Sequence, residues 1–254
     1  MGTGHAGGGV TVSVVIPTRN DAGMLARCLE LLSRQTRPAD EIIVVDNAST
    51  DSTANICSAA GVRRIPVDVP GIPATAAAGF DAAAGDIIAR LDTDSTPPAD
   101  WLERVEAVLA AADPLSLVTG PGEFYGAPRW IRWAGRHVFL GGYFKAVGFL
   151  LGHPPVYGSN FALRRDVWQE IRGSVVRTNA EVHDDLDISY RLRPDMTVIY
   201  DRTLTVGVSS RPLTSWASFR RHVDMSVATF RVEFKEVPPL RRRLERLRAG
   251  RRRA

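Results

Sequence analysis

The chain has 254 residues, of which 44% are hydrophobic and 24% charged, and a formal net charge of +4. This balance is typical of a globular protein and excludes a disordered or fibrous one. No apolar run reaches the length of about 18 to 20 residues needed to cross a bilayer. We therefore expect a cytoplasmic protein that reaches a membrane only peripherally, on its inner face.

The composition also suggests how the chain is divided. A glycine-rich stretch at 1–9 lacks the features of a signal peptide and is expected to be a disordered lead-in. One domain is expected over 10–235, followed by a basic tail at 236–254. Cys28 and Cys57 have no CxxC spacing, so they indicate neither a zinc site nor a disulfide framework.

The domain opens with two strand and helix units. The β-branched run 12–16 predicts a buried strand that ends in the loop 17–20, and the apolar periodicity of 21–35 predicts a helix with Asp21 as N-cap. A second apolar run, 41–45, ends at Asp46 and precedes a helix start signal near Asp51. This rhythm favours a parallel sheet with helices on both faces.

Ligands of such sheets bind beyond the carboxyl ends of the strands, so the loops 17–20 and 46–49 are expected to share a cleft. A carboxylate at Asp46 can accept a hydrogen bond from a base or from a ribose hydroxyl. Its alternative role is to cap the second helix, which Ser49 or Asp51 would serve equally well.

A short run at 63–67 predicts a third strand and 71–85 predicts a helix. The next strand, 86–91, ends in Asp92 and Asp94. Two carboxylates spaced by one residue can hold a hard divalent cation through oxygen ligands. They can equally cap the helix expected over 99–112, since Asp is favoured at N-caps. These residues alone leave both interpretations open.

Two further blocks follow the acidic pair along the chain, so that five stand in order: Val12–Asn20, Glu41–Asp51, Leu91–Asp94, Gly158–Arg165 and His183–Leu192. In this order they resemble the family 2 inverting glycosyltransferases of the GT-A fold, and the resemblance covers about 10–230. The acidic residues of the last block could otherwise be only a helix N-terminus favoured by the macrodipole.

The resemblance implies one α/β domain with a mixed, mostly parallel sheet flanked by helices. It also implies a nucleotide-diphosphate sugar as donor and Mg²⁺ or Mn²⁺ as cofactor. By position, it implies that Asp185 is the catalytic base with Asp184 as its acidic neighbour, that Pro17, Arg19, Asp46 and Asp92 contact the nucleotide, and that Asp94 binds the metal.

The stretch 218–222 resembles the C-terminal helix of the family, which bears an arginine and closes on the diphosphate or the acceptor. Arg221 is therefore expected to contact the donor, and His222 is a candidate metal ligand, although a surface histidine is the alternative. One departure concerns 75–79, which lacks the Arg-Asn pair common in the family. The base of the donor is therefore not identified.

Two regions remain beyond these motifs. Residues 124–157 interleave aromatic and cationic side chains, typical of an acceptor cleft or a membrane interface, although a core helix pair would look similar for 139–151. In the tail, Leu240, Leu244 and Leu247 recur at helical spacing among arginines. This pattern favours an amphipathic helix on an anionic membrane surface over a nucleic-acid-binding arm, with a solvated, disordered tail as the alternative.

Together these features predict a metal-dependent inverting glycosyltransferase that moves a sugar to a hydroxyl or phosphate acceptor of a lipid-linked or cell-envelope glycan. One alternative is a catalytically silent nucleotide-sugar-binding accessory protein of polysaccharide assembly. The other is a nucleotidyltransferase, which would normally need a glycine-rich, lysine-bearing loop where this chain has 17–20. No nucleic-acid partner is expected.

Overall fold

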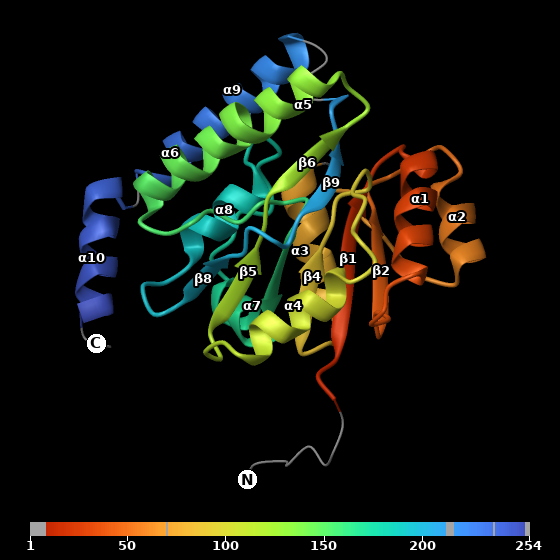
Figure 1. Ribbon diagram of the computed structural model, residues 1–254, viewed down its shortest axis with the longest axis horizontal. Helices are drawn as coiled ribbons and strands as arrows, with labels where there is room; N and C mark the ends of the chain where they lie inside the picture. Colours follow the sequence, from red (N-terminus) through yellow and green to blue (C-terminus); the bar gives the residue numbers. More distant parts are fainter. Residues whose placement is uncertain (1–8, 70, 212–215, 236, 252–254) are drawn as a thin grey trace.

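The computed structural model describes residues 9–69, 71–211, 216–235 and 237–251, with the side chains at 216–219, 221–223 and 250–251 outside that description. A seven-stranded sheet in the order β3-β2-β1-β4-β7-β5-β8 forms the centre (Figure 1). Neighbouring strands are parallel except where β7 lies antiparallel to β4 and β5. The predicted α/β class is confirmed. The strands are β1 (Val12–Thr18), β2 (Glu41–Asp46), β3 (Arg63–Pro66), β4 (Ile87–Arg90), β5 (Ser116–Thr119), β7 (Phe161–Arg164) and β8 (Thr197–Tyr200).

Helices cover both faces of this sheet. On β1, Val12, Val14 and Ile16 belong to the core shared with α1, α2 and α4, whereas Val15 belongs to the core shared with α3, α7 and α8. This follows from the period of two along a strand, which sends successive side chains to opposite faces. The helices are α1 (Ala22–Ser33), α2 (Thr53–Ala60), α3 (Ile72–Ala82), α4 (Trp101–Ala110), α7 (Arg165–Ile171) and α8 (Asp184–Arg191).

A separate two-stranded sheet rises above the main one. It pairs β6 (Gly122–Tyr125) in parallel with β9 (Val206–Ser209), and neither strand joins the seven-stranded sheet. The side-chain amide of Asn160 donates to the carbonyl oxygens of Pro121 at 3.2 Å and Leu204 at 2.6 Å. These bonds hold both segments where they leave the main sheet.

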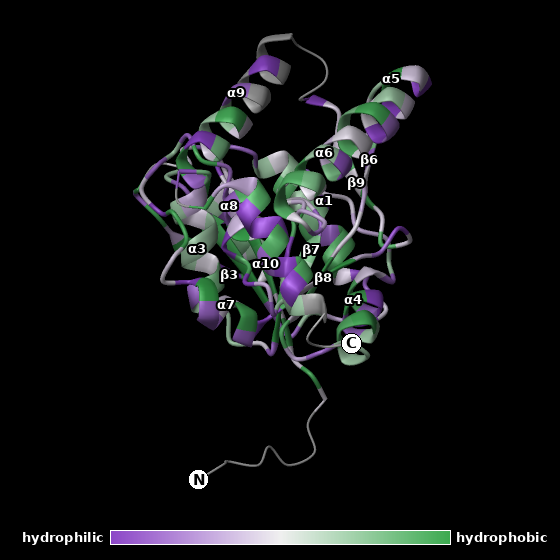
Figure 2. Ribbon diagram, turned by 90° about the vertical axis from the view of Figure 1, so that its left-hand side faces the viewer, coloured by the Kyte–Doolittle hydropathy of each residue, from purple (hydrophilic) through white to green (hydrophobic). Residues whose placement is uncertain are grey.

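Helical segments form the upper edge of the molecule. α5 (Arg129–Ala134), the π-helical segment η1 (Gly135–Leu140) and α6 (Gly141–Leu151) follow one another without a break, and α9 (Trp216–Glu233) lies behind them in Figure 1. In Figure 2, α5 and α9 project from the body on opposite sides. One side of α6 is buried through Val147 and Leu151, whereas Trp130, Trp133 and Phe149 are exposed. The 139–151 segment is thus only partly core.

The tail forms a helix, α10 (Pro239–Arg251), whose packing differs from the expected arrangement. Arg242 is buried, donates to the carbonyl of Leu192 at 2.9 Å and lies 4.2 Å from the ring centroid of Tyr190. Leu240 and Leu247 instead are 72% and 59% exposed. Guanidinium groups can satisfy free carbonyl oxygens at the end of α8, which leucines cannot, so part of the cationic face packs inward.

Across the described residues, no helix combines the length and the apolar character that a membrane span requires. The segment 139–152, the nearest candidate in the sequence, belongs to η1 and α6 and carries Lys145 on its exposed side. It lies over the sheet domain, partly exposed.

Candidate active site

A cleft with a volume of about 1390 Å³ opens at the carboxyl ends of β1, β2 and β4. Pro17, Thr18 and Arg19 line it after β1, and Asn47 lines it after β2. The loops after the first two strands therefore share one cleft, as expected from parallel strands. Side chains of α5, η1, α6, α8 and α9 form the walls.

Asp92 lies on the cleft floor directly after β4. Its Oδ1 accepts from Arg90 at 3.0 Å and its Oδ2 accepts from the Ser159 hydroxyl at 2.5 Å. The backbone carbonyl of Asp92 accepts from Ser95 N–H in a tight turn at 3.0 Å. Helix α4 begins later, at Trp101, with Asp100 at its N-cap position. Asp92 and Asp94 therefore do not cap that helix.

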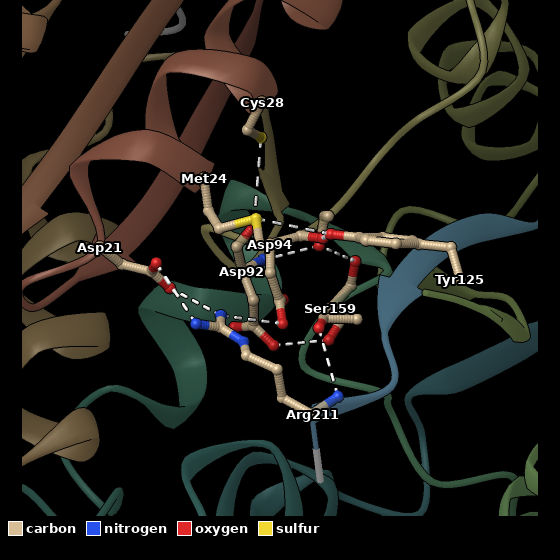
Figure 3. A network of polar contacts seen from close by, with 10 residues as sticks. Asp21, Met24, Cys28, Asp92, Asp94, Tyr125, Ser159 and Arg211 are labelled. Atoms are coloured by element: carbon tan, nitrogen blue, oxygen red, sulfur yellow. Dashed lines mark hydrogen bonds and ion pairs between the residues drawn. The ribbon is translucent and has the colours of Figure 1, made fainter. Parts of the chain in front are cut away.

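Asp94 faces the same cleft but has a different environment (Figure 3). Burial, and then the neighbouring charge of Asp92, raise the pKa of Asp94 to about 6. Tyr125 donates its hydroxyl to the Asp94 backbone carbonyl at 2.7 Å, which fixes the loop. A nearby positive charge would favour the ionised form of the Asp94 carboxyl. In this structure an arginine supplies that charge.

That arginine is Arg211, which follows β9 and which the sequence analysis missed. Its guanidinium lies 2.7 Å from Asp21 Oδ2 and 3.3 Å from Asp94 Oδ2 (Figure 3). Asp21 stands at the N-cap position of α1 but makes no side-chain cap bond there. A single arginine after a short strand carries no local signal, because only the fold brings it 117 residues back to Asp94.

The acidic block forms the first turn of α8 and also lines the cleft. Asp184 is buried and forms an ion pair with Arg90, which also pairs with Asp92. Burial raises the pKa of the Asp184 carboxyl, and the Arg90 guanidinium opposes that rise. Arg90 thereby links the two acidic motifs. The sequence analysis missed it, although a charged residue at the end of a buried strand is itself a signal.

Asp185 is half-buried at the cleft surface. Its Oδ2 accepts from Gly158 N–H at 2.9 Å and its Oδ1 accepts from Leu186 N–H at 2.8 Å. A Cβ at position 158 would lie 3.2 Å from Asp185 Oδ2, so glycine lets this backbone approach. The carboxylate is therefore oriented by two donors and still borders the cleft.

Asp46 is not among the residues that line the cleft. It is buried, accepts from Ser49 N–H at 3.0 Å and forms an ion pair with Arg64 at 2.6 Å. A base or ribose would have to displace Arg64 to reach this carboxylate. The nucleotide role of Asp46 stays a prediction.

The side chains of Arg221 and His222 lie outside the described residues, so their predicted roles stay predictions. Over the described part of the chain, no three His, Cys, Asp or Glu residues gather closely enough to hold a metal without further ligands. A cation bound by Asp94 would therefore take most of its ligands from elsewhere, as Mg²⁺ does when substrate phosphates complete its shell.

These features define an α/β domain with a ligand cleft at its strand ends, carboxylates on two walls and arginines between them. The chain belongs to the family described as glycosyl transferase family 2, whose model matches residues 13–172. The family resemblance predicted from the sequence is confirmed.

Curated relatives match over part of the chain. Glycosyltransferase AglE of Haloferax volcanii is 33% identical over 121 residues, which cover 44% of this chain and 40% of that protein. A PGL/p-HBAD biosynthesis glycosyltransferase of Mycobacterium tuberculosis is 36% identical over 115 residues, covering 42% and 45%. The chain thus spans less than half the length of these relatives.

Solved structures share the fold over more of the chain. Glucosyl-3-phosphoglycerate synthase from Mycobacterium tuberculosis, in complex with Mn²⁺, UDP-glucose and glycerol 3-phosphate, has a TM-score of 0.61 and 21% identity. The match covers 85% of this chain and 79% of that one. The fold is therefore the GT-A fold expected from the sequence.

Proposed function

We propose that the protein is a metal-dependent inverting glycosyltransferase. It moves a sugar from a nucleotide-diphosphate donor to a hydroxyl or phosphate acceptor of a lipid-linked or cell-envelope glycan. A relative with 35% identity over 106 residues, from Pseudomonas fluorescens, is an undecaprenyl-phosphate 4-deoxy-4-formamido-L-arabinose transferase, of which the match covers 31%. This relative supports the class of acceptor.

The observation that carries the proposal is the position of Asp185. A carboxylate held by the Gly158 N–H, bordering the same cleft as Asp94, has the geometry of a general base facing a phosphate-binding wall. Arg90 connects the two sides through its ion pairs with Asp92 and Asp184. The base and the donor side are thus fixed relative to each other.

The residues present fit a divalent cation at Asp94. Both Asp92 oxygens already accept hydrogen bonds, from Arg90 and Ser159, so Asp92 suits positioning better than ligation. The Asp94 carboxylate has a raised pKa of about 6 and lies beside the exposed guanidinium of Arg211. When bound there, a divalent cation neutralises the charge that develops on the departing diphosphate.

The chain's own groups do the rest. Asp185 takes the proton of the acceptor hydroxyl while the oxygen attacks the anomeric carbon on the face opposite the diphosphate. The bond from that carbon to the phosphate oxygen breaks, so the anomeric configuration inverts and a nucleoside diphosphate leaves. Arg211, placed beside Asp94, can donate charge-assisted hydrogen bonds to phosphate oxygens.

The acceptor side supports a lipid-linked substrate. The cleft wall formed by η1 and α6 contributes Val138, Phe139 and Val147, and nearby Trp130 and Trp133 are 71% and 61% exposed. Indole rings are favoured at membrane interfaces. We therefore propose that the protein lies peripherally on the inner face of a membrane, with exposed side chains of α5, α6 and α10 in contact with lipid.

A product assay tests the function. The purified chain is incubated with Mn²⁺, a polyprenyl phosphate or diacylglycerol acceptor, and a panel of UDP-, GDP- and dTDP-sugars. We expect one donor to yield glycosylated lipid together with nucleoside diphosphate, and the Asp94→Ala variant to yield neither. Donor binding with neither sugar transfer to lipid nor donor hydrolysis would favour a catalytically silent accessory protein. Release of pyrophosphate would favour a nucleotidyltransferase.

A further inference from the structure

A second groove, of about 1000 Å³, lies on the other side of η1 and α6 from the transfer cleft. Five of its lining residues are Arg or Lys, two are His, and none in the described part of the chain is Asp or Glu. Like charges gathered without a counterion repel one another. The cationic and histidine side chains that line it are Arg136, His137, Lys145, His153, Arg202, Arg243 and Arg246.

Two of these cations are brought in by α10. Gly152 ends α6 with a φ of +78°, and a Cβ there would lie 3.4 Å from the Arg243 Cα, so glycine permits this close approach. Arg243 donates to the carbonyl of Phe149 at 2.6 Å, and Arg246 donates to the carbonyl of Leu192 at 2.9 Å. Carbonyl oxygens orient both guanidinium groups, and the charge of Asp195 acts on Arg246 from outside the groove lining.

Other cations converge from the opposite wall. Lys145 and Arg202 are exposed, and within the described residues neither forms an ion pair, while Arg136 lies 3.9 Å from Glu123. Burial raises the pKa of Tyr200, and the charges of Arg202 and Arg136 oppose this rise. Both cations therefore lie near the Tyr200 ring. The rings of Tyr200 and Phe144, with centroids 4.6 Å apart, form the apolar part of the wall.

A buried histidine also borders the groove. His153 lines it, its Nδ1 donates to the carbonyl of Pro154 at 2.7 Å, and its buried Nε2 makes no hydrogen bond within 3.5 Å, although the Ser189 backbone lies near enough to raise the pKa of the ring. Burial, and then the charge of Arg246, lower the pKa of His153 to about 3. Burial and Arg242 likewise lower the pKa of Arg246 to about 9, so it stays charged at neutral pH. An anion in the groove would favour the charged forms of both His153 and Arg246.

We propose that this groove binds a phosphate group, held by Lys145, Arg202, Arg243 and Arg246 and contacting the imidazole of His153. The shared chemistry is a phosphate mono- or diester, which can come from a soluble phosphate or from a lipid headgroup. The site is separate from the transfer cleft and stands on residues that the proposed transfer reaction does not use.

Histidine NMR on the full-length chain tests the site, with inorganic phosphate as the probe. The chain has five histidines, so their ring signals can be resolved, and His183 reports separately on phosphate in the transfer cleft that it lines. We expect the ring nitrogen signals of His153 to shift saturably. In the Lys145→Gln/Arg202→Gln variant, the midpoint should rise about tenfold for each cation removed.

The matched control is Arg34→Gln/Arg63→Gln, which removes two exposed charges, one at the C-cap of α1 and one on β3, the edge strand at the far end of the sheet from β8. Its midpoint should equal that of the wild type. His153 signals that do not move with phosphate, or equal midpoints in the two double variants, would overturn the proposal.

Vesicle co-sedimentation identifies the source of the phosphate. If it is a lipid headgroup, the Lys145→Gln/Arg202→Gln variant binds phosphatidylglycerol vesicles more weakly than the control variant, and inorganic phosphate competes with the vesicles. If it is soluble, the two variants bind these vesicles equally while the His153 response to phosphate persists. Either result supports the site and assigns its ligand.

Discussion

Arg90 is the residue on which the two acidic motifs of the cleft depend. It is buried and has Asp92 and Asp184 as ion-pair partners, so one cation compensates two carboxylates that approach from distant parts of the chain. Removing one partner of a buried ion pair leaves an uncompensated charge, which costs more than the pair itself contributes.

We therefore expect Arg90→Met to lower the free energy of unfolding by about 3 to 5 kcal/mol at neutral pH. Without Arg90, the pKa of Asp184 in the folded state rises further above its value in the unfolded chain. The folded state therefore binds the proton more tightly than the unfolded state does. The loss should shrink as pH falls through that raised pKa. Urea denaturation at neutral and acid pH measures it, and Arg90→Met/Asp184→Asn should recover part of the stability.

If Asp94 binds the metal as proposed, its carboxyl is expected to set the pH dependence of metal binding. Because its pKa is about 6 and a cation needs the ionised carboxylate, Mn²⁺ affinity should fall by about tenfold per pH unit below that value and level off above it. Electron paramagnetic resonance of free Mn²⁺ measures the affinity. Arg211→Ala should move the midpoint upward, since Arg211 opposes the rise in pKa. An affinity that is independent of pH would exclude Asp94 as the ligand.

Residues inside short motifs were accessible from the sequence, whereas their partners were not. Asp92, Asp94, Asp184 and Asp185 stand in recognisable blocks and all line one cleft. Arg211 meets Asp94 across 117 residues, and such a contact depends on tertiary structure alone. Likewise, the helix-capping role considered for Asp92 and Asp94 could be excluded only from the observed start of α4.

Among the elements, α10 shows how a basic helix can pack. The arginine-rich pattern predicted a helix but not which of its sides would face the domain. Arg242 is buried against Tyr190 and the Leu192 carbonyl, contacts that hydrophobic periodicity does not encode. The first two strands and helices, by contrast, follow from apolar runs and periodicity, because local pattern and burial agree there.

Arg242→Ala should lower the free energy of unfolding by about 2 kcal/mol, since it loses a buried hydrogen bond and a cation–π contact. Arg248→Ala, an exposed position on the same helix, should change it by less than about 0.5 kcal/mol. Thermal or urea unfolding of the two variants compares them directly. Equal stability would mean that α10 does not dock through Arg242.

For the whole molecule, the exposed apolar side chains of α5, α6 and α10 suggest one lipid-facing side. Leu240→Glu/Leu247→Glu should weaken binding to anionic vesicles by at least about tenfold per leucine without loss of stability, since both side chains are exposed. Val69→Glu alters another exposed apolar residue and is the matched control. If both variants co-sediment with vesicles like the wild type, this side does not contact lipid.

The most direct test of the transfer mechanism is the Asp185→Asn variant, measured for donor binding and for sugar transfer to a hydroxyl acceptor with the donor found in the panel. Asparagine keeps the shape but cannot take a proton at neutral pH, so we expect transfer to fall about a thousandfold while the dissociation constant of the donor stays close to that of the wild type. Transfer at a near wild-type rate in this variant would contradict the assignment of Asp185 as the base.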